Sequence, residues 1–167
     1  METILIVDDE KNYLTILSAV LEEEGFEVLT ALSGQEALEI YKTSDLDLVV
    51  TDMKMPEMDG IALLENIKQL DPDLPVMMMT AHGTIDKAVE AMQKGAYNYI
   101  LKPFDNERLV LYVNKAVSMY RVVKENRQLS LQRRPAVNKD VDQIFTASKA
   151  HCHRNHGDCN GCPMRLK

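Results

Sequence analysis

The sequence predicts an α/β fold, in which a doubly wound parallel sheet of five strands is covered by five helices. Three observations support this prediction: short apolar runs alternate five times with segments of helical periodicity, the connecting loops are short, and polar residues follow the apolar runs. Such runs are typical of strands that are buried on both faces of a parallel sheet. One domain of this kind fits within the 167 residues and leaves room for an appendage.

The first half of the chain begins with an apolar strand over Thr3–Val7. Apolar residues then recur at helical spacing until Gly25, which we expect to stop the helix. A second strand is predicted over Phe26–Thr30. The pair Ser33 and Glu36 then has the spacing of a capping box, which predicts the start of the second helix.

The second half repeats this alternation. Its predicted elements are a strand over Leu46–Asp52, a helix after Gly60, a strand over Pro75–Thr80, a helix over about Thr84–Gln93, a strand over Tyr97–Leu101 and one long helix from Asp105. We interpret the three consecutive methionines of the fourth strand as core residues rather than soft-metal ligands, because that strand is buried on both faces. Right-handed crossovers then bring the carboxyl ends of all five strands to one edge of the sheet.

Five polar residues are expected at this edge: Asp8, Asp9, Asp52, Thr80 and Lys102. The three carboxylates repel one another unless a cation offsets their charge, and Mg²⁺ prefers a few carboxylates, a backbone carbonyl and retained waters. A phosphoryl group on Asp52 would share its charge between such a metal ion and Lys102. Each residue alone also fits a helix cap, a strand end or a surface charge, but the coincidence at four strand ends favours a site.

The motifs at these positions resemble those of a known family. IVDDE, TDMKMPEMDG, MMTAHG and YNYILKPF are similar to the motifs of the receiver domain of two-component response regulators, over about residues 1–125. GTIDKAVEAMQKGAYNYILKPFD and ENRQL are most similar to receivers of the nitrogen-regulatory class of sigma-54 activators. The resemblance implies a flavodoxin-like sheet with strand order 2-1-3-4-5 and an extended last helix.

The resemblance also implies the chemistry of the edge. Asp52 accepts a phosphoryl group from the phosphohistidine of a histidine kinase or of a phosphotransfer protein. The implied Mg²⁺ ligands are Asp9, Asp52 and the backbone carbonyl of Lys54, with Asp8 acting mainly through bound water. The protein is then a phosphoacceptor with at most slow autodephosphorylation, not an enzyme. In the family, Lys54 and His82 stand at positions that flank the path of a hydrolytic water.

A conformational switch is implied as well. Thr80 moves toward the phosphoryl group, and Tyr99 turns its ring into the space that Thr80 leaves. The added negative charge and its strong acceptors create new hydrogen bonds that bias a two-state packing. Permanent burial of Tyr99 in the core is the structural alternative.

Two other functions are alternatives to this phosphoacceptor switch. In the first, the tail senses a metal or a redox signal and the receiver serves as a docking platform. In the second, the chain is a Mg²⁺-dependent phosphatase of the haloacid-dehalogenase type. That chemistry requires a second Asp two residues after the nucleophile, and Lys54 occupies the position.

The last helix carries an apolar stripe: Leu109, Val113, Ala116, Met119 or Tyr120, and Val123. We expect its first half to pack on the sheet and its second half, which passes into an extension over residues 126–137, to pair with a second copy. Fraying of the helix after about Tyr120 is the alternative. The sequence contains no GxxxxGK[ST] loop, and residues 133–167 are too few for a helix-turn-helix domain, so we expect action through protein contacts.

The tail over residues 138–167 contains all three cysteines, Cys152, Cys159 and Cys162. Cys159 and Cys162 have the spacing of a metal knuckle, and His156 is one histidine that would complete a tetrahedral Zn²⁺ site. An iron–sulfur cluster or a redox-active thiol pair fits the same residues, and a flexible tail with reactive thiols is the alternative without metal. The receiver resemblance does not extend to this motif.

Composition limits the partners. Residues 1–132 contain 23 acidic and 12 basic residues, whereas residues 133–167 contain three acidic and seven basic residues. An acidic globule repels nucleic acid, so we expect no direct binding to it. No apolar stretch approaches the roughly 18–20 residues that cross a bilayer, and the N-terminus lacks a basic leader. We therefore expect a cytoplasmic protein with no membrane partner.

Overall fold

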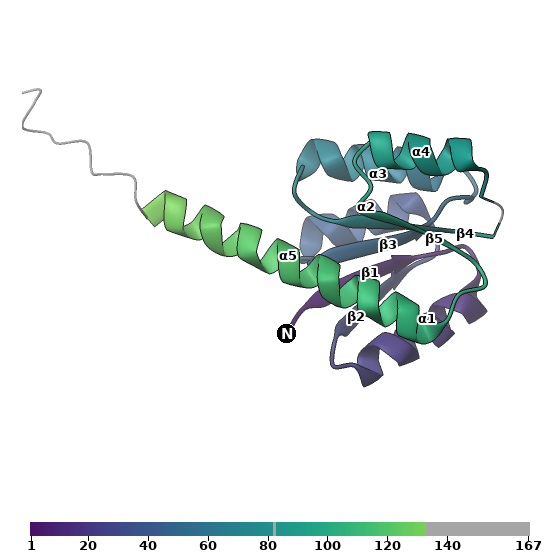
Figure 1. Ribbon diagram of the computed structural model, residues 1–167, viewed down its shortest axis with the longest axis horizontal. Coiled ribbons are helices and arrows are strands. Elements are labelled where there is room, and N and C mark those ends of the chain that lie inside the picture. The colour runs from purple at the N-terminus through teal and green to yellow at the C-terminus, as the bar shows by residue number, and fades with distance from the viewer. Residues whose placement is uncertain (82, 133–167) are drawn as a thin grey trace, which may run out of the picture. The chain divides into compact units, whose positions relative to one another are not determined.

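The computed structural model describes residues 1–81 and 83–132 as a five-stranded parallel sheet with five helices (Figure 1). The elements are β1 Thr3–Val7, α1 Lys11–Glu23, β2 Glu27–Ala31, α2 Gly34–Thr43, β3 Leu48–Asp52, α3 Gly60–Leu70, β4 Val76–Thr80, α4 Ile85–Gln93, β5 Asn98–Leu101 and α5 Asn106–Gln132. Their order in the sheet is β2-β1-β3-β4-β5, and every neighbouring pair is parallel. The predicted fold class and strand order are confirmed. Met1–Gln128 forms one compact unit, to which the following description applies.

Helices cover both faces of the sheet. Figure 1 shows α1 and α5 on one face, and α2, α3 and α4 on the other. β1 is buried along its whole length: Ile4 and Ile6 pack in the cluster with α1 and α5, while Leu5 and Val7 pack in the cluster with α3. The central strands β3 and β4 are likewise buried along their whole length, and this burial on both faces explains why the sequences of these three strands are nearly continuous apolar runs. The three methionines of β4 are fully buried, which confirms them as core residues.

The helix ends follow the local sequence, whereas the strands β2, β3, β4 and β5 each begin one or two residues later than predicted. Gly25 has φ 92°, and the N–H of Phe26 donates to Leu21 O (3.2 Å), so Phe26 closes the end of α1 and β2 begins one residue later than predicted. The N–H of Glu36 donates to Ser33 Oγ at 3.2 Å, as in a capping box. The Glu36 carboxylate, however, accepts from the N–H of Leu32 (2.8 Å) and not from that of Ser33.

The apolar stripe of α5 faces the protein's own core. Leu109, Val113, Ala116 and Tyr120 are all at most 4% exposed, and the partly buried Val123 packs against the cluster that contains Tyr120. Met119, in contrast, is 60% exposed, so Tyr120 is the inward residue of the two. The stripe expected to meet a second copy is therefore already covered within the chain as far as Val123, because the sheet and its amino-end loops extend that far along the helix.

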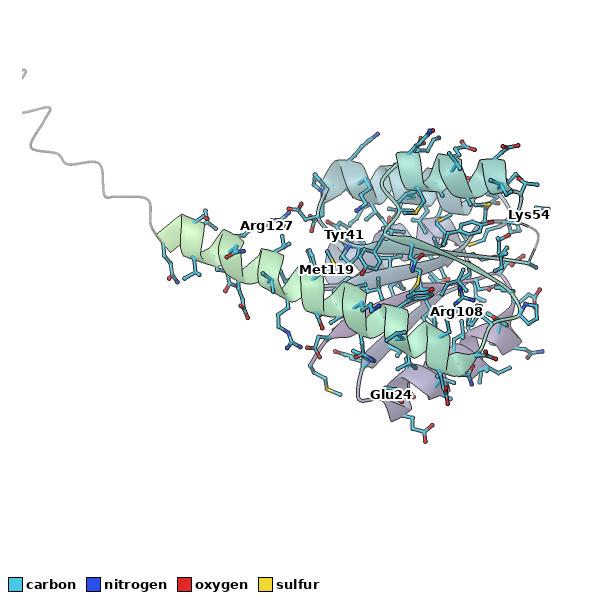
Figure 2. The ribbon with its side chains drawn as sticks, in the orientation of Figure 1. Glu24, Tyr41, Lys54, Arg108, Met119 and Arg127 are labelled. Atoms are coloured by element: carbon cyan, nitrogen blue, oxygen red, sulfur yellow. The ribbon has the colours of Figure 1, made fainter. Side chains whose placement is uncertain are left out.

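Charged groups fix the later turns of α5 to the body. Lys124 Nζ lies 3.0 Å from Asp45 Oδ1 and 2.9 Å from Asp47 Oδ1. Arg127 pairs with Asp71 (3.0 Å) and with Asp73, and the Tyr120 hydroxyl donates to Asp71. We call these seven residues the α5 anchor. The four carboxylates precede β3 and β4, so the anchor lies at the amino edge of the sheet, whereas Lys54 follows β3 at the opposite edge (Figure 2).

Candidate acidic site at the carboxyl edge of the sheet

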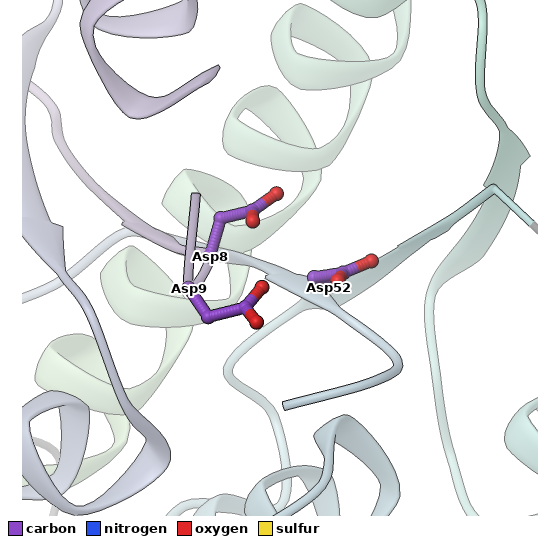
Figure 3. A group of neighbouring side chains, drawn as sticks. All are labelled: Asp8, Asp9 and Asp52. Atoms are coloured by element: carbon purple, nitrogen blue, oxygen red, sulfur yellow. The ribbon is translucent and has the colours of Figure 1, made fainter. Parts of the chain in front are cut away.

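Three carboxylates meet where β1 and β3 end (Figure 3). Asp8 and Asp9 follow β1, Asp52 is the last residue of β3, and these two strands are neighbours in the sheet. One carboxylate oxygen from each residue lies within 4.8 Å of the others. Asp8 is fully buried and Asp52 is 9% exposed, while Asp9 is open to solvent. The predicted convergence of these side chains at one edge is therefore observed.

The turn after β3 depends on Asp59 and Gly60. The Asp59 carboxylate accepts from the N–H of Ala62 at 2.7 Å and so caps α3. A Cβ at Gly60 would lie 2.3 Å from the carbonyl oxygen of Asp52 and 2.9 Å from Met53 Cα. Only glycine allows α3 to start this close to the end of β3, and that start sets the backbone that carries the Asp52 side chain.

Lys102 supplies the positive charge of the site. Its Nζ lies 2.7 Å from Asp8 Oδ2 and 3.6 Å from Asp52 Oδ1, and its side chain is 13% exposed. Its backbone N–H donates to Thr80 O (2.8 Å), which holds the residue at the end of β4, and its peptide bond to Pro103 is cis. The other Asp8 oxygen accepts from the N–H of Glu10 at 2.9 Å. Asp8 therefore orients Lys102 beside Asp52.

Burial and the neighbouring opposite charge shift the pKa of Asp52, and likewise that of Lys102, in opposite directions. Burial raises the pKa of Asp52, Lys102 lowers it, and Asp8 raises it again, so that it lies above its ordinary value. Burial alone would lower the pKa of Lys102, but its hydrogen bond to Asp8 and the charge of Asp52 outweigh burial and raise it. Lys102 consequently stays protonated. The carboxylates still outnumber it three to one, which favours binding of a further cation.

Thr80 and Tyr99 lie on neighbouring strands beside this site. Thr80 ends β4 and is 1% exposed, and Tyr99 stands on β5 with a buried hydroxyl. Burial raises the pKa of the Tyr99 phenol, and the Thr80 hydroxyl offsets part of that rise. A Cβ at Gly83 would lie 2.1 Å from the Tyr99 hydroxyl oxygen, so this ring occupies the space that a side chain at position 83 would need.

Of the other predicted site residues, the structure describes Lys54 but not His82 or those of the tail. Lys54 has an exposed side chain and lines, together with Asp9, a cavity of about 680 Å³ between the loop after β3 and the helices α3 and α4. His82 and the tail residues Cys152, His156, Cys159 and Cys162 lie outside the described residues. Sequence reasoning missed Tyr13, whose ring faces the Lys102 ammonium at 4.0 Å. Its place in the first turn of a helix that starts at the acidic edge was the available signal.

The fold and the acidic edge together define a response regulator receiver domain. Residues 4–114 match the family described as "Response regulator receiver domain", and the chain belongs to that family. Receivers of this family are partners of histidine kinases. None of the helices within the described residues is long and apolar enough to cross a membrane.

The curated relatives are larger regulators. The transcriptional regulatory protein ZraR of Escherichia coli K12 is 45% identical over 115 residues, which are 69% of this chain and 26% of ZraR. The DNA-binding transcriptional regulator NtrC of Klebsiella pneumoniae is 43% identical over 122 residues, or 73% of this chain and 26% of NtrC. The similarity to the nitrogen-regulatory class is thus confirmed for the receiver. The chain spans about a quarter of the length of these relatives.

Solved structures show the same relationship. A receiver domain protein from Clostridium thermocellum is 38% identical with a TM-score of 0.70, and the match covers 74% of this chain and 99% of that one. The beryllofluoride-activated NtrC4 receiver domain dimer is 41% identical with a TM-score of 0.69, covering 72% of this chain and 99% of that one. Both align with the receiver fold over nearly their whole length.

Proposed function

We propose that the protein is a phosphorylation-activated response regulator in which Asp52 accepts a phosphoryl group from the phosphohistidine of a sensor kinase or phosphotransfer protein. The observation that carries this proposal is the position of Asp52, beside the carboxylates of Asp8 and Asp9 and 3.6 Å from the Lys102 ammonium. A carboxylate nucleophile needs charge stabilisation and positioning more than covalent help from its neighbours.

In the proposed step, an Asp52 oxygen attacks the phosphorus atom in line with the leaving group. The P–N bond breaks, and the imidazole nitrogen leaves with the electron pair. Lys102, charged and held by Asp8, donates to a phosphoryl oxygen of the acyl phosphate that forms. Burial of Asp52 limits access of water to the mixed anhydride, which is consistent with slow hydrolysis rather than turnover.

The three carboxylates fit Mg²⁺, since their oxygens converge within 4.8 Å and Asp9 is open to solvent for retained waters. We assign Asp9, Asp52 and the backbone carbonyl of Lys54 as direct ligands and Asp8 as a ligand through water. Bound Mg²⁺ would supply charge neutralisation for the phosphoryl oxygens.

The proposed output is a change in protein contacts. The Thr80 hydroxyl donates a hydrogen bond to the phosphoryl group, and the Tyr99 ring then shifts toward β4. The burial of Thr80 at the end of β4 and of the Tyr99 hydroxyl on the adjacent strand β5 supports this coupling. A homodimer is supported by exposed apolar residues on α5, namely Met119, Val122, Leu129 and Leu131, and by the dimeric state named for the NtrC4 receiver. The downstream partner is proposed to be a protein in the cytoplasm.

Incubation with acetyl phosphate and Mg²⁺ tests the proposal. Intact-mass spectrometry is expected to show one added phosphoryl group on the wild type and none on Asp52→Ala. A matched control is Glu24→Gln, which alters an exposed carboxylate at the far end of α1 and is expected to react like the wild type. Absence of added mass on the wild type, or an equal gain on Asp52→Ala, would contradict the assignment.

The second candidate function rests on the Cys159 and Cys162 spacing in the sequence. In this reading the tail, with Cys152 and His156 as further ligands, binds Zn²⁺ or an iron–sulfur cluster and senses a metal or redox signal. Elemental analysis of the full chain prepared without an affinity tag tests it. Less than about a tenth of an equivalent of bound metal would remove the metal proposal.

A further inference from the structure

The Lys102 ammonium lies 4.0 Å from the centroid of the Tyr13 ring and above its face. We propose that Tyr13 is a positioning residue for phosphoryl transfer, because its ring face holds the Lys102 ammonium where it can reach a phosphoryl group on Asp52. The inference rests on the proposed phosphoacceptor function and adds a residue from α1 to the site.

The Lys102 ammonium has three neighbours that together define its position. Asp8 Oδ2 lies at 2.7 Å, Asp52 Oδ1 at 3.6 Å and the Tyr13 ring centroid at 4.0 Å, and the lysine side chain is 13% exposed. A cation over an aromatic face is attracted by the ring quadrupole, more strongly where water is largely excluded. The ring therefore opposes movement of the Lys102 ammonium away from its position between the ring, Asp8 and Asp52.

A ring face suits this task better than another hydrogen-bond acceptor would. An ammonium has three donors, and Asp8 uses one of them at 2.7 Å. The ring attracts the charge without accepting a strong hydrogen bond, so the remaining Lys102 donors stay available for phosphoryl oxygens. A carboxylate at position 13 would compete for those donors and would add to the repulsion among the three aspartates.

The orientation of the Tyr13 ring is itself fixed. The ring of Phe104, two residues after Lys102, meets it edge to face with centroids 6.2 Å apart and an interplanar angle of 86°. Both rings pack against the core cluster under α1 and α5. The segment that carries Lys102 thus also supports the ring that positions it, and the contact depends on the aromatic face rather than on the Tyr13 hydroxyl.

The test compares Tyr13→Phe, which keeps the ring face, with Tyr13→Leu, which keeps an apolar side chain and removes the face. The full chain is phosphorylated with acetyl phosphate in the presence of saturating Mg²⁺. Acetyl phosphate is a small donor, so effects on kinase docking are excluded. Tyr13→Phe is expected to react within about twofold of the wild type, and Tyr13→Leu about tenfold more slowly. In NMR spectra, the Lys102 ε-methylene protons are expected to show a ring-current upfield shift in the wild type and in Tyr13→Phe, but not in Tyr13→Leu.

Phe104→Leu serves as the packing control, because it removes the neighbouring ring but leaves the Tyr13 face. The positioning role is overturned if Tyr13→Leu reacts within about twofold of the wild type, or if Phe104→Leu is as slow while its Lys102 ring-current shift persists. It is also overturned if Tyr13→Phe is as slow as Tyr13→Leu. Failure of the wild type to accept phosphate, with the ring-current shift present, would instead contradict the phosphoacceptor function and leave the contact standing.

Discussion

The Tyr120 hydroxyl donates to Asp71 Oδ2 at 2.7 Å and thereby joins the middle of α5 to the C-cap of α3. Tyr120 is 4% exposed, and Asp71 satisfies the hydrogen-bonding need of its hydroxyl. Burial raises the pKa of Asp71, but the hydrogen bonds from Tyr120 and Arg127 outweigh burial and hold the pKa below its ordinary value. The bond therefore connects a neutral phenol to an ionised carboxylate.

Tyr120→Phe is expected to lower the free energy of unfolding by about 2 kcal/mol, because a part-buried hydrogen bond to a charged acceptor is lost. Urea denaturation followed by circular dichroism measures this change. Tyr112→Phe is the control, since its hydroxyl only accepts from Arg108 at the exposed surface, and it is expected to stay within about 0.5 kcal/mol of the wild type. Equal losses of unfolding free energy in both variants would show that the hydrogen bond to Asp71 does not stabilise the fold more than the surface contact of Tyr112.

The stabilisation by this bond is expected to depend on pH. The folded pKa of Asp71 lies below the unfolded one, so the contribution is complete above the unfolded value of about 4 and is lost as the pH falls through the folded pKa. The difference in unfolding free energy between the wild type and Tyr120→Phe should thus be constant from about pH 5 to 7 and shrink below about pH 4. A difference that grows on acidification would reverse the assigned sign.

Magnesium is expected to stabilise the fold through the three carboxylates. At a concentration ten times its Kd, a ligand that binds only the folded state adds about 1.4 kcal/mol to the unfolding free energy. Thermal scans with MgCl₂ and with a chelator should show this gain in the wild type and little of it in Asp9→Asn. Glu24→Gln should retain the full gain, because it lies away from the site. A Mg²⁺ effect that persists in Asp9→Asn would place the ion elsewhere.

Two glycines are expected to respond differently to alanine. Gly60→Ala places a methyl group 2.3 Å from the Asp52 carbonyl, so it should cost about 2–3 kcal/mol and slow phosphorylation of Asp52. Gly25→Ala meets no atom within 4 Å and has only its φ of 92° to overcome, so it should cost about 1–2 kcal/mol without changing that rate. Denaturant unfolding and the acetyl phosphate assay separate the two. A normal phosphorylation rate in Gly60→Ala would contradict the steric argument.

The Gly83 and Tyr99 positions are expected to be coupled. Gly83→Ala should destabilise the wild type, because its methyl group would lie 2.1 Å from the Tyr99 hydroxyl oxygen. In Tyr99→Phe the nearest ring atom is 3.0 Å away, and only the end of the Leu101 side chain, with Cδ2 at 2.6 Å, still has to shift. The double-mutant cycle should show an interaction of at least about 1 kcal/mol, with the alanine tolerated better in Tyr99→Phe. Additive costs in denaturant unfolding would mean that the ring does not need the space at Gly83.

The sequence was sufficient for the architecture and for the meeting of Asp8, Asp9 and Asp52. Burial on both faces produces continuous apolar runs, and parallel strands must end at one edge, so topology follows from pattern. The assignments of Asp9, Lys54 and Tyr99 to specific roles remain predictions, because they concern states with a metal ion or a phosphoryl group.

Contacts between side chains distant in sequence could not be predicted. Lys124 and Asp45 are 79 residues apart and meet only because a loop before β3 lies against α5. The same geometry buries Tyr120, so an apolar stripe that suggested a partner helix is satisfied by the protein's own core. Hydrophobic periodicity identifies a face of a helix but does not specify what covers it.

The rate at which the three methionines of β4 are oxidised should report how often the sheet opens at this strand. Met77, Met78 and Met79 are inaccessible to peroxide in the closed structure, whereas Met92 and Met119 are 48% and 60% exposed. Conversion of the exposed pair to sulfoxide should therefore follow simple surface chemistry, while that of the strand should proceed only through transient separation of β4 from its neighbours. Peptide mapping of sulfoxide formation over time would then measure the local opening of β4, the strand next to the one that ends at Asp52, without any introduced label.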